Sequence, residues 1–319
     1  MMRSQLLRGG RILLGLTILF FLIKRLYNLL AAFEVEAIAF QPFWLIASLT
    51  LLILYFAVLW LPWFFFYRAG NVNPIPFLSG WTFFQISQFG RYLPGKIGHF
   101  LWMLSLARRF GIEKKRAVLA TCFQLACQSS LGCLIGFLIL RNTEVASLLD
   151  DLLTVFQMPG KMGILIGSIG TITLGTGTIF FYRQRIMEAV SHLMKQDFHV
   201  PFLISGTLRF ISGYLLLWEL LGSAFFFFIN SIYPVDFSQL IIVTGIYAVA
   251  WSIGFLSFLT PSGLGVREGI LSLLLTTVLP PATAILVALL SRLWTLGTEL
   301  SLGGLAFGIY FRQRRVQQN

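Results

Sequence analysis

The chain has 319 residues, of which 57% are hydrophobic and only 11% are charged, and its mean hydropathy is +0.83. Soluble domains typically carry roughly 25% charged residues, so this composition excludes a soluble protein and predicts an integral membrane protein. Residues 1–319 are expected to form one all-α domain, a polytopic bundle of about 6–8 transmembrane helices, with no soluble domain.

Residues 12–30 form the first apolar run, which we expect to be retained as a helix because no signal segment with a small-residue cleavage site precedes it. Arginines precede this run and glutamates follow it, which favours a cytoplasmic N-terminus. Lys24 and Arg25 lie inside the run. Either the helix is short and these side chains reach towards the outer surface, or the second half of the run lies along the membrane interface.

A second span is predicted over residues 43–66, with Trp60, Trp63 and Tyr67 as interfacial aromatic residues. The next two apolar segments, residues 77–89 and 100–107, are each too short to cross a bilayer, which requires about 20 residues. A Pro-Gly pair lies between them. This pattern predicts a re-entrant hairpin, because irregular backbone survives at membrane depth only inside protein or beside a water-filled cavity.

The rest of the chain alternates apolar runs with polar segments. We predict an amphipathic cytoplasmic helix over residues 183–197 and apolar runs over residues 117–140, 162–182, 200–229, 240–258, 270–279 and 284–310. Most Lys and Arg residues outside these runs lie in the N-terminus, the 108–116 loop, the 183–197 helix and the C-terminal tail, whereas the outer loops contain Arg141 and Lys161. This asymmetry places both termini in the cytoplasm, and it explains the net charge of +12 without nucleic acid as a partner.

A second irregular stretch, residues 260–268, separates two of the apolar runs. It contains Pro261, two glycines, Gly263 and Gly265, and the adjacent opposite charges Arg267 and Glu268. A charged side chain at bilayer depth costs about 3 kcal/mol on insertion scales, so intramembrane charges tend to mark functional pathways. Each of the two Pro/Gly breaks is followed by a basic residue. They predict a pair of helix N-termini suited to a phosphate, and we expect both to open from the cytoplasmic half.

Other ionisable residues also remain inside the predicted apolar segments. Arg292 and Glu299 are seven residues apart on one helix face, so they need partners from neighbouring helices, and the adjacent Arg267 and Glu268 need different partners. Such residues either form buried ion pairs that fix helix register or line a polar cavity for an anionic group. The remaining ionisable residues in the apolar segments are Lys96, Arg209 and Glu219, with Arg91 close by. Two uncharged polar residues, Gln124 and Gln128, either form hydrogen bonds between helices or line the same cavity.

Enzymatic and metal chemistry have little support in the sequence. The 3 cysteines lie in one apolar run without paired spacing, and the 3 histidines fall in separate segments, so we predict no metal and no cofactor. The chain contains no Walker A, G-x-S-x-G or H-E-x-x-H motif. His99, beside the predicted hairpin tip, is the only suggestion of an intramembrane transferase, and we expect that the chain is not an enzyme.

Two segments resemble elements of a known family. Leu93-Pro94-Gly95-Lys96-Ile97-Gly98 is similar to the P-G-[RK]-x-G element, and Pro261-Ser262-Gly263-Leu264-Gly265-Val266-Arg267-Glu268 to the P-G-G-L-G-x-x-E element, of the flippase-like membrane domain of lysylphosphatidylglycerol synthases (MprF-type) and its stand-alone YbhN-like and AglD-like relatives. Arg292 also fits the pattern, and the resemblance covers nearly the whole chain. The chain departs from the family in two ways. It has no counterpart of the soluble aminoacyl-transferase domain, so lipid lysylation is not expected, and it carries glutamines where the helix after the first motif often has ionisable residues.

The resemblance implies movement of a lipid or a lipid-linked sugar between leaflets. We therefore predict a multi-pass protein of the bacterial plasma (inner) membrane that binds and translocates an anionic phospholipid or lipid-linked glycan. The alternative is a non-transporting partner that holds a glycosyltransferase or lipid-modifying enzyme at the membrane. The predicted substrate-binding residues are Pro94, Gly95, Lys96, Gly98, Arg209, Glu219, Gly263, Gly265, Arg267, Glu268, Arg292 and Glu299.

Overall fold

The computed structural model describes residues 40–68, 75–92, 97–141, 204–256, 263 and 265–318, and the secondary structure of these residues is helical. Within them, five segments are long and apolar enough to span a membrane: Pro42–Arg68, Lys114–Leu140, Ser212–Asn230, Phe237–Phe255 and Pro281–Gln313. The predicted polytopic membrane bundle is therefore confirmed. Three predicted elements, residues 12–30, 162–182 and 183–197, lie outside the described residues.

The first described span consists of two consecutive helices, α2 (Pro42–Val58) and α3 (Trp60–Arg68), which were predicted as one. Pro62 explains the break, because it has no N–H to donate to the carbonyl of Val58 and its ring would clash with that carbonyl. The aromatic residues predicted at the interface are instead buried inside the bundle. Trp63 Nε1, for example, donates a hydrogen bond to Thr121 Oγ1 at 3.0 Å.

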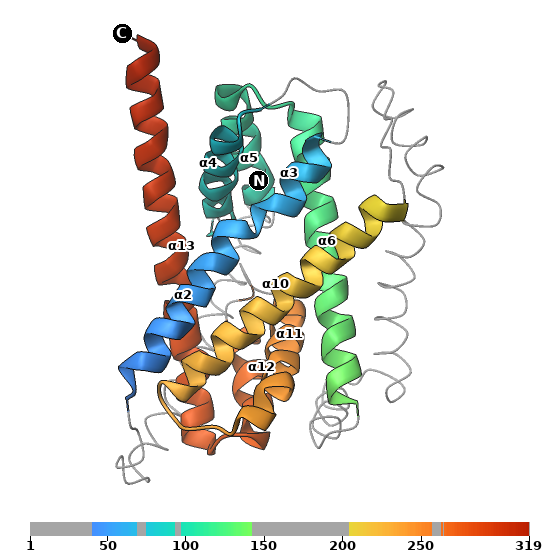
Figure 1. The fold of residues 1–319 in the computed structure, drawn as a ribbon, viewed down its shortest axis with the longest axis vertical. Coiled ribbons are helices and arrows are strands. Elements are labelled where there is room, and N and C mark those ends of the chain that lie inside the picture. The colour runs from blue at the N-terminus through green and yellow to red at the C-terminus, as the bar shows by residue number, and fades with distance from the viewer. Residues whose placement is uncertain are drawn as a thin grey trace, which may run out of the picture.

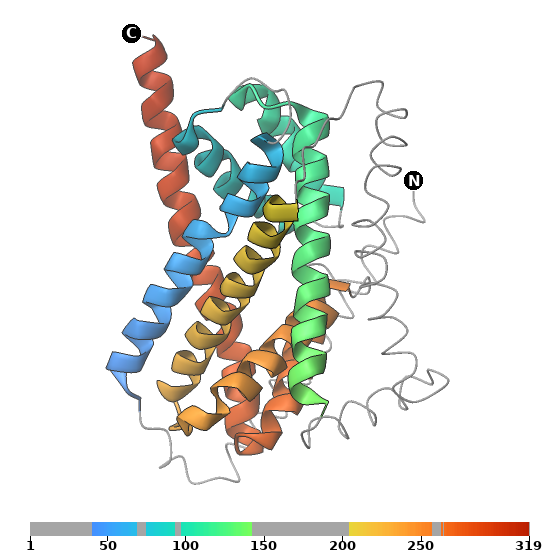
Figure 2. The same cartoon turned by 45° about the vertical axis from the view of Figure 1, so that its right-hand side comes forward.

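The predicted re-entrant hairpin is formed by α4 (Phe77–Gln88), the short 3-10 helix η2 (Phe89–Tyr92) and α5 (Ile97–Ala107). Trp102 Nε1 donates to the Ile86 carbonyl at 2.9 Å and joins the two arms. A Cβ at position 90 would lie 2.8 Å from the Cα of His99, so only glycine at this position allows the two arms to approach so closely. Figures 1 and 2 show both arms, α4 and α5, at the same end of the bundle.

The next helices cross the bundle. A 3-10 turn, η3 (Arg108–Phe110), leads into α6 (Lys114–Leu140), which begins inside the basic run, before the predicted residue 117. α10 (Ile204–Asn230) packs across α2, and Ser48 Oγ donates to the Ala224 carbonyl at 2.7 Å. η4 (Phe237–Gln239) then leads into α11 (Leu240–Leu256), which lies along α6.

The second irregular stretch is followed by α12 (Val266–Leu274), η6 (Leu275–Thr277) and the long α13 (Pro281–Gln318). α12 begins before the predicted residue 270 because the Glu268 carboxylate accepts the Gly265 N–H at 2.7 Å and caps the first turn. Pro281 starts α13, since proline is tolerated in a first turn. α13 continues past the predicted residue 310, so the basic tail with Arg312 and Arg315 is helical.

The described helices that flank the two breaks lie at opposite ends of the bundle. In both views α11 and α12 lie at the end opposite to α4 and α5 (Figures 1 and 2). The expectation that both breaks open from the same half is therefore wrong. The reason is the path of the chain. Helix α11 starts at the end of the bundle where α10 finishes and runs inwards. Helix α12 then returns to that end, and α13 crosses the whole bundle.

Candidate functional site

A cavity of about 170 Å³, here called the central cavity, lies where residues from the two broken regions meet. One side is formed by η2 and α5, another by α11 and the start of α12, and the rest by α2, α6, α10 and α13. Pockets for drug-sized ligands usually measure roughly 300–1,000 Å³. The central cavity is therefore the size for a headgroup and not for a whole lipid.

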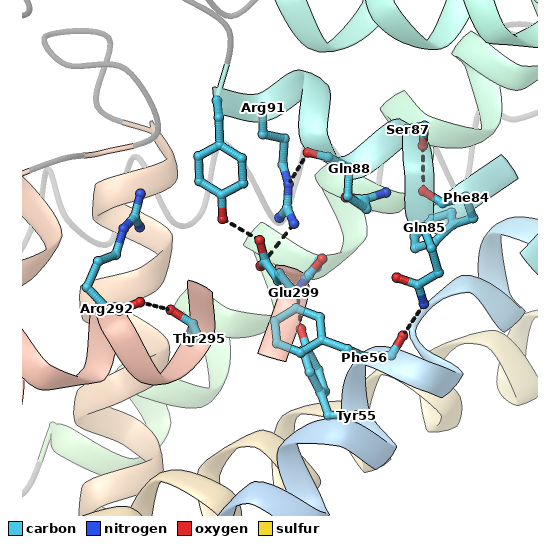
Figure 3. Close-up of polar contacts among 12 residues, drawn as sticks. Tyr55, Phe56, Phe84, Gln85, Ser87, Gln88, Arg91, Arg292, Thr295 and Glu299 are labelled. Carbon is cyan, nitrogen blue, oxygen red and sulfur yellow. Dashed lines mark hydrogen bonds and ion pairs between the residues drawn. The ribbon is translucent and has the colours of Figure 1, made fainter. Parts of the chain in front are cut away.

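Glu299 of α13 is held by the tip of the first hairpin. Arg91 Nη2 lies 3.1 Å from Glu299 Oε1, and the Tyr92 hydroxyl donates to Oε2. Arg91 Nε also donates to the Gln88 carbonyl at 3.4 Å, which fixes the guanidinium against its own helix end (Figure 3). The Glu299 side chain is only 12% exposed. Two donors thus satisfy this carboxylate and join the first tip to α13.

Glu299→Gln is expected to lower the free energy of unfolding by about 2 kcal/mol, because hydrogen bonds to charged groups contribute about 1.5–3 kcal/mol each and the amide is a poorer partner for Arg91. Chemical denaturation of the detergent-solubilised protein measures this loss. Glu219→Gln is the matched control, since that side chain is exposed, and its effect should stay within about 0.5 kcal/mol. Equal losses in the two variants would show that the contact with Arg91 is not stabilising.

The first turn of α12 contains Arg267 and Glu268, whose side chains have different partners, as predicted. Arg267 Nη2 donates to the Tyr247 hydroxyl of α11, and its Cζ lies 4.9 Å from the centre of that ring. Glu268 Oε2 accepts the Gly265 N–H, while Oε1 lies 3.9 Å from Arg292 Nη1. Arg292 and Glu299 therefore contact two different neighbouring elements, which confirms the prediction that this helix face needs outside partners.

Two glycines permit the close approach of α11 and α12. Gly263 has φ +69°, and a Cβ there would lie 2.5 Å from the Gly254 carbonyl oxygen. A Cβ at Gly254 would lie 2.7 Å from the Arg267 Cβ. Backbone of α11 thus packs directly against the break, and this contact holds the Arg267 side chain at the cavity wall.

Gln128 fulfils both roles that the sequence left open. Its Nε2 donates to the Tyr55 hydroxyl at 2.8 Å, and its side chain lines the central cavity. Its backbone carbonyl also accepts from Trp218 Nε1 at 3.2 Å. Gln124 is buried on the same helix but does not line that cavity, and its Oε1 has no hydrogen-bond partner within the described part of the chain.

The structure brings only some of the predicted site residues together. Gly263, Arg267, Arg292 and Glu299 line the central cavity. Gly265 and Glu268 do not line it, but Glu268 contacts the N–H of Gly265 and lies beside the lining residue Arg292. Gly98 is buried in α5 and Glu219 is exposed on α10, and neither lines the cavity. The side chain of Arg209 lies outside the described residues, as do three further predicted positions: Pro94, Gly95 and Lys96.

Several lining residues were not predicted from the sequence. Tyr55, Tyr92, Tyr247 and Thr295 all line the central cavity. The sequence gives little indication of them, because tyrosine and threonine also occur in ordinary membrane helices that are rich in aromatic residues. Tyr92 is the exception, since it stands directly beside the Pro/Gly break of the first hairpin.

Residues 10–303 match the family model described as lysylphosphatidylglycerol synthase TM region. This range includes both Pro/Gly breaks and every residue that lines the central cavity. No curated protein and no solved structure gives a significant match to the chain.

Proposed function

Because the chain belongs to the lysylphosphatidylglycerol synthase TM region family, we propose that it binds the phosphate of an anionic phospholipid or lipid-linked glycan in the central cavity and moves this headgroup between leaflets. The observation that carries the proposal is the position of Arg267 and Arg292 on the cavity wall, between broken helices that enter from opposite ends. Guanidinium groups are the preferred partners of phosphate, and broken helices typically frame substrate sites in transporters.

We place the basic end of the bundle at the cytoplasmic face of a bacterial plasma membrane. The end of α3, the end of α5, the start of α6 and the end of α13 lie together at one end of the bundle. The exposed basic residues described in these segments are Arg68, Arg108, Arg109, Lys114, Lys115, Arg312 and Arg315. An excess of Lys and Arg is the usual mark of the cytoplasmic side.

Transport fits the central cavity better than catalysis does. A transferase would need a base beside the substrate. Glu299, the carboxylate that lines the cavity among the described residues, is already engaged by Arg91 and Tyr92. A carboxylate with two donors on its oxygens is a weak base. His99, the other candidate base on the cavity wall, is acted on by the positive charge of Arg91, which opposes the proton that a base must accept. The site therefore suits binding better than proton transfer.

The direct test is reconstitution of the purified chain into vesicles that contain a phospholipid with a fluorophore on its acyl chain. A membrane-impermeant quencher then reports how fast lipids leave the inner leaflet. We expect faster loss of fluorescence than in protein-free vesicles. If the rates are equal for protein shown to be folded, the transport proposal is wrong. A stable complex with a glycosyltransferase or lipid-modifying enzyme on gentle purification would then support the non-transporting alternative.

A further inference from the structure

The charged side chains at the central cavity carry a net positive charge among the residues that the structure describes. Three arginines and Glu299 line the cavity, and the carboxylate of Glu268 lies behind Arg292. Three positive and two negative groups leave one positive charge. A buried charge is costly unless another charge compensates it, so the matching occupant is a monoanion. A phosphodiester carries this charge at neutral pH.

One part of the cavity wall has donors that suit the oxygens of a phosphodiester. The Tyr247 hydroxyl accepts a hydrogen bond from Arg267, and the Tyr55 hydroxyl accepts one from Gln128 Nε2. Because a phenol both accepts and donates, each of these hydroxyl groups still has its proton to donate. Arg292 Nη1, at 3.9 Å from Glu268, is beyond hydrogen-bond distance and can also turn towards a ligand.

The first hairpin tip contributes an acceptor instead. His99 lines the cavity and is only 6% exposed. Its ring makes a hydrogen bond with the Ser87 backbone, whereas Nδ1 has no partner in the described ranges. A buried acceptor without a donor costs about 1–3 kcal/mol. A ligand that places a hydrogen-bond donor beside Nδ1 would remove this cost.

The charge near His99 distinguishes between possible donors. Arg91 and His99 line the same cavity, and the charge of Arg91 acts on the His99 ring, so it would repel an ammonium group placed beside that ring. A hydroxyl group donates a hydrogen bond without carrying a charge. The environment of His99 therefore favours a hydroxyl over an amine.

We propose that the central cavity selects a monoanionic phosphodiester lipid whose headgroup is uncharged and bears hydroxyl groups, as glycerol and sugars do, and that His99 accepts a hydrogen bond from one of these hydroxyls. This inference rests on the proposed function and narrows its substrate. The cavity wall also includes Trp251 and Phe255, whose rings stack with centres 5.4 Å apart at 6°. These rings suit the apolar part of a lipid that lies next to its phosphate. A free phosphodiester has no such apolar part.

The test compares lipids with identical acyl chains, by native mass spectrometry of the full chain in competition. Phosphatidylglycerol is the expected ligand, and phosphatidylmethanol has the same charge without the hydroxyl groups. We expect the wild-type chain to retain phosphatidylglycerol about tenfold better than phosphatidylmethanol, as one buried hydrogen bond allows. Phosphatidylethanolamine and lysylated phosphatidylglycerol, which carry an ammonium group, should bind more weakly still.

His99→Leu should reduce the ratio of phosphatidylglycerol to phosphatidylmethanol to about one, and His99→Asn, whose side-chain oxygen accepts a hydrogen bond, should restore most of it. Equal retention of the two lipids by the wild type, or a preference for either ammonium lipid, would overturn the inference. So would competition by soluble glycerophosphoglycerol at the same concentration as the lipid, because the ligand would then be a free phosphodiester. If lipids move in vesicles but no preference appears, only this inference fails; if the chain neither moves nor retains lipid, the proposed function fails as well.

Discussion

Replacement of Arg267 and Arg292 together by glutamine is expected to slow lipid translocation about a hundredfold. Each guanidinium offers hydrogen bonds that contribute about 1.5–3 kcal/mol when one partner is charged, and about 1.4 kcal/mol corresponds to a factor of ten. Among the described residues, the double substitution also changes the charge at the central cavity from net positive to net negative, since Glu268 and Glu299 remain. The measurement is the initial rate of lipid movement in vesicles, at equal amounts of folded protein.

The matched control is the double variant Arg312→Gln, Arg315→Gln, which removes two arginines from the exposed end of α13. Its rate should stay within about twofold of the wild type. The conservative pair Arg267→Lys, Arg292→Lys keeps the charge but loses the planar guanidinium, so an intermediate rate is expected. If the glutamine double variant folds and moves lipid at the wild-type rate, these arginines only stabilise the bundle and the proposed phosphate site is wrong.

The second large effect is expected for Gly263→Ala, which should lower the free energy of unfolding by about 3 kcal/mol. A left-handed backbone costs about 1–2 kcal/mol for a residue with a side chain, and overpacking adds about 1–3 kcal/mol. Both costs apply here, since φ is +69° and the added Cβ would lie 2.5 Å from the Gly254 oxygen. Because this contact holds Arg267 at the cavity, lipid retention should fall as well. Thermal unfolding and native mass spectrometry provide the two measurements.

Gly269→Ala is the control on the same helix. Nothing lies within 4 Å of a Cβ at this position, and alanine is favoured over glycine inside a helix by up to about 1 kcal/mol. We therefore expect slightly higher stability and unchanged lipid retention. A loss of stability equal to that of Gly263→Ala would mean that the close packing of α11 against the break does not occur.

The membrane helices could be predicted from the sequence because their apolar runs are long and because charged residues are so costly within them. The first hairpin followed from the length of its two apolar segments, neither of which can cross a bilayer, and from the Pro-Gly pair between them. Helix ends were predicted less well. A prediction based on hydropathy ends a helix at its first charged residue. In the structure, α12 begins at Val266 because Glu268 caps it. Helix α13 continues beyond the apolar region through an arginine-rich end.

The charged part of the site was also predictable, because Arg267, Arg292 and Glu299 are conspicuous in apolar runs. Their partners were not. Tyr247 and Tyr55 reach the central cavity only through the packing of α11 and α2 around it. The opposite directions of the two broken regions likewise depend on how many times the chain crosses the bilayer before each of them, which hydropathy does not determine when half-length segments are present.

The entry of the broken helices from opposite ends has a consequence for the energy source of the proposed transport. A headgroup that leaves the cavity past α4 and α5 crosses one part of the membrane potential, and one that leaves past α11 and α12 crosses the rest. The positive charges of the arginines belong to the protein and do not cross the membrane with the lipid. Each headgroup that crosses completely therefore carries only its own charge through the membrane potential. For a monoanion, an inside-negative potential of 100 mV contributes about 2.3 kcal/mol towards outward movement. Voltage alone would then give the transport its direction, without a nucleotide.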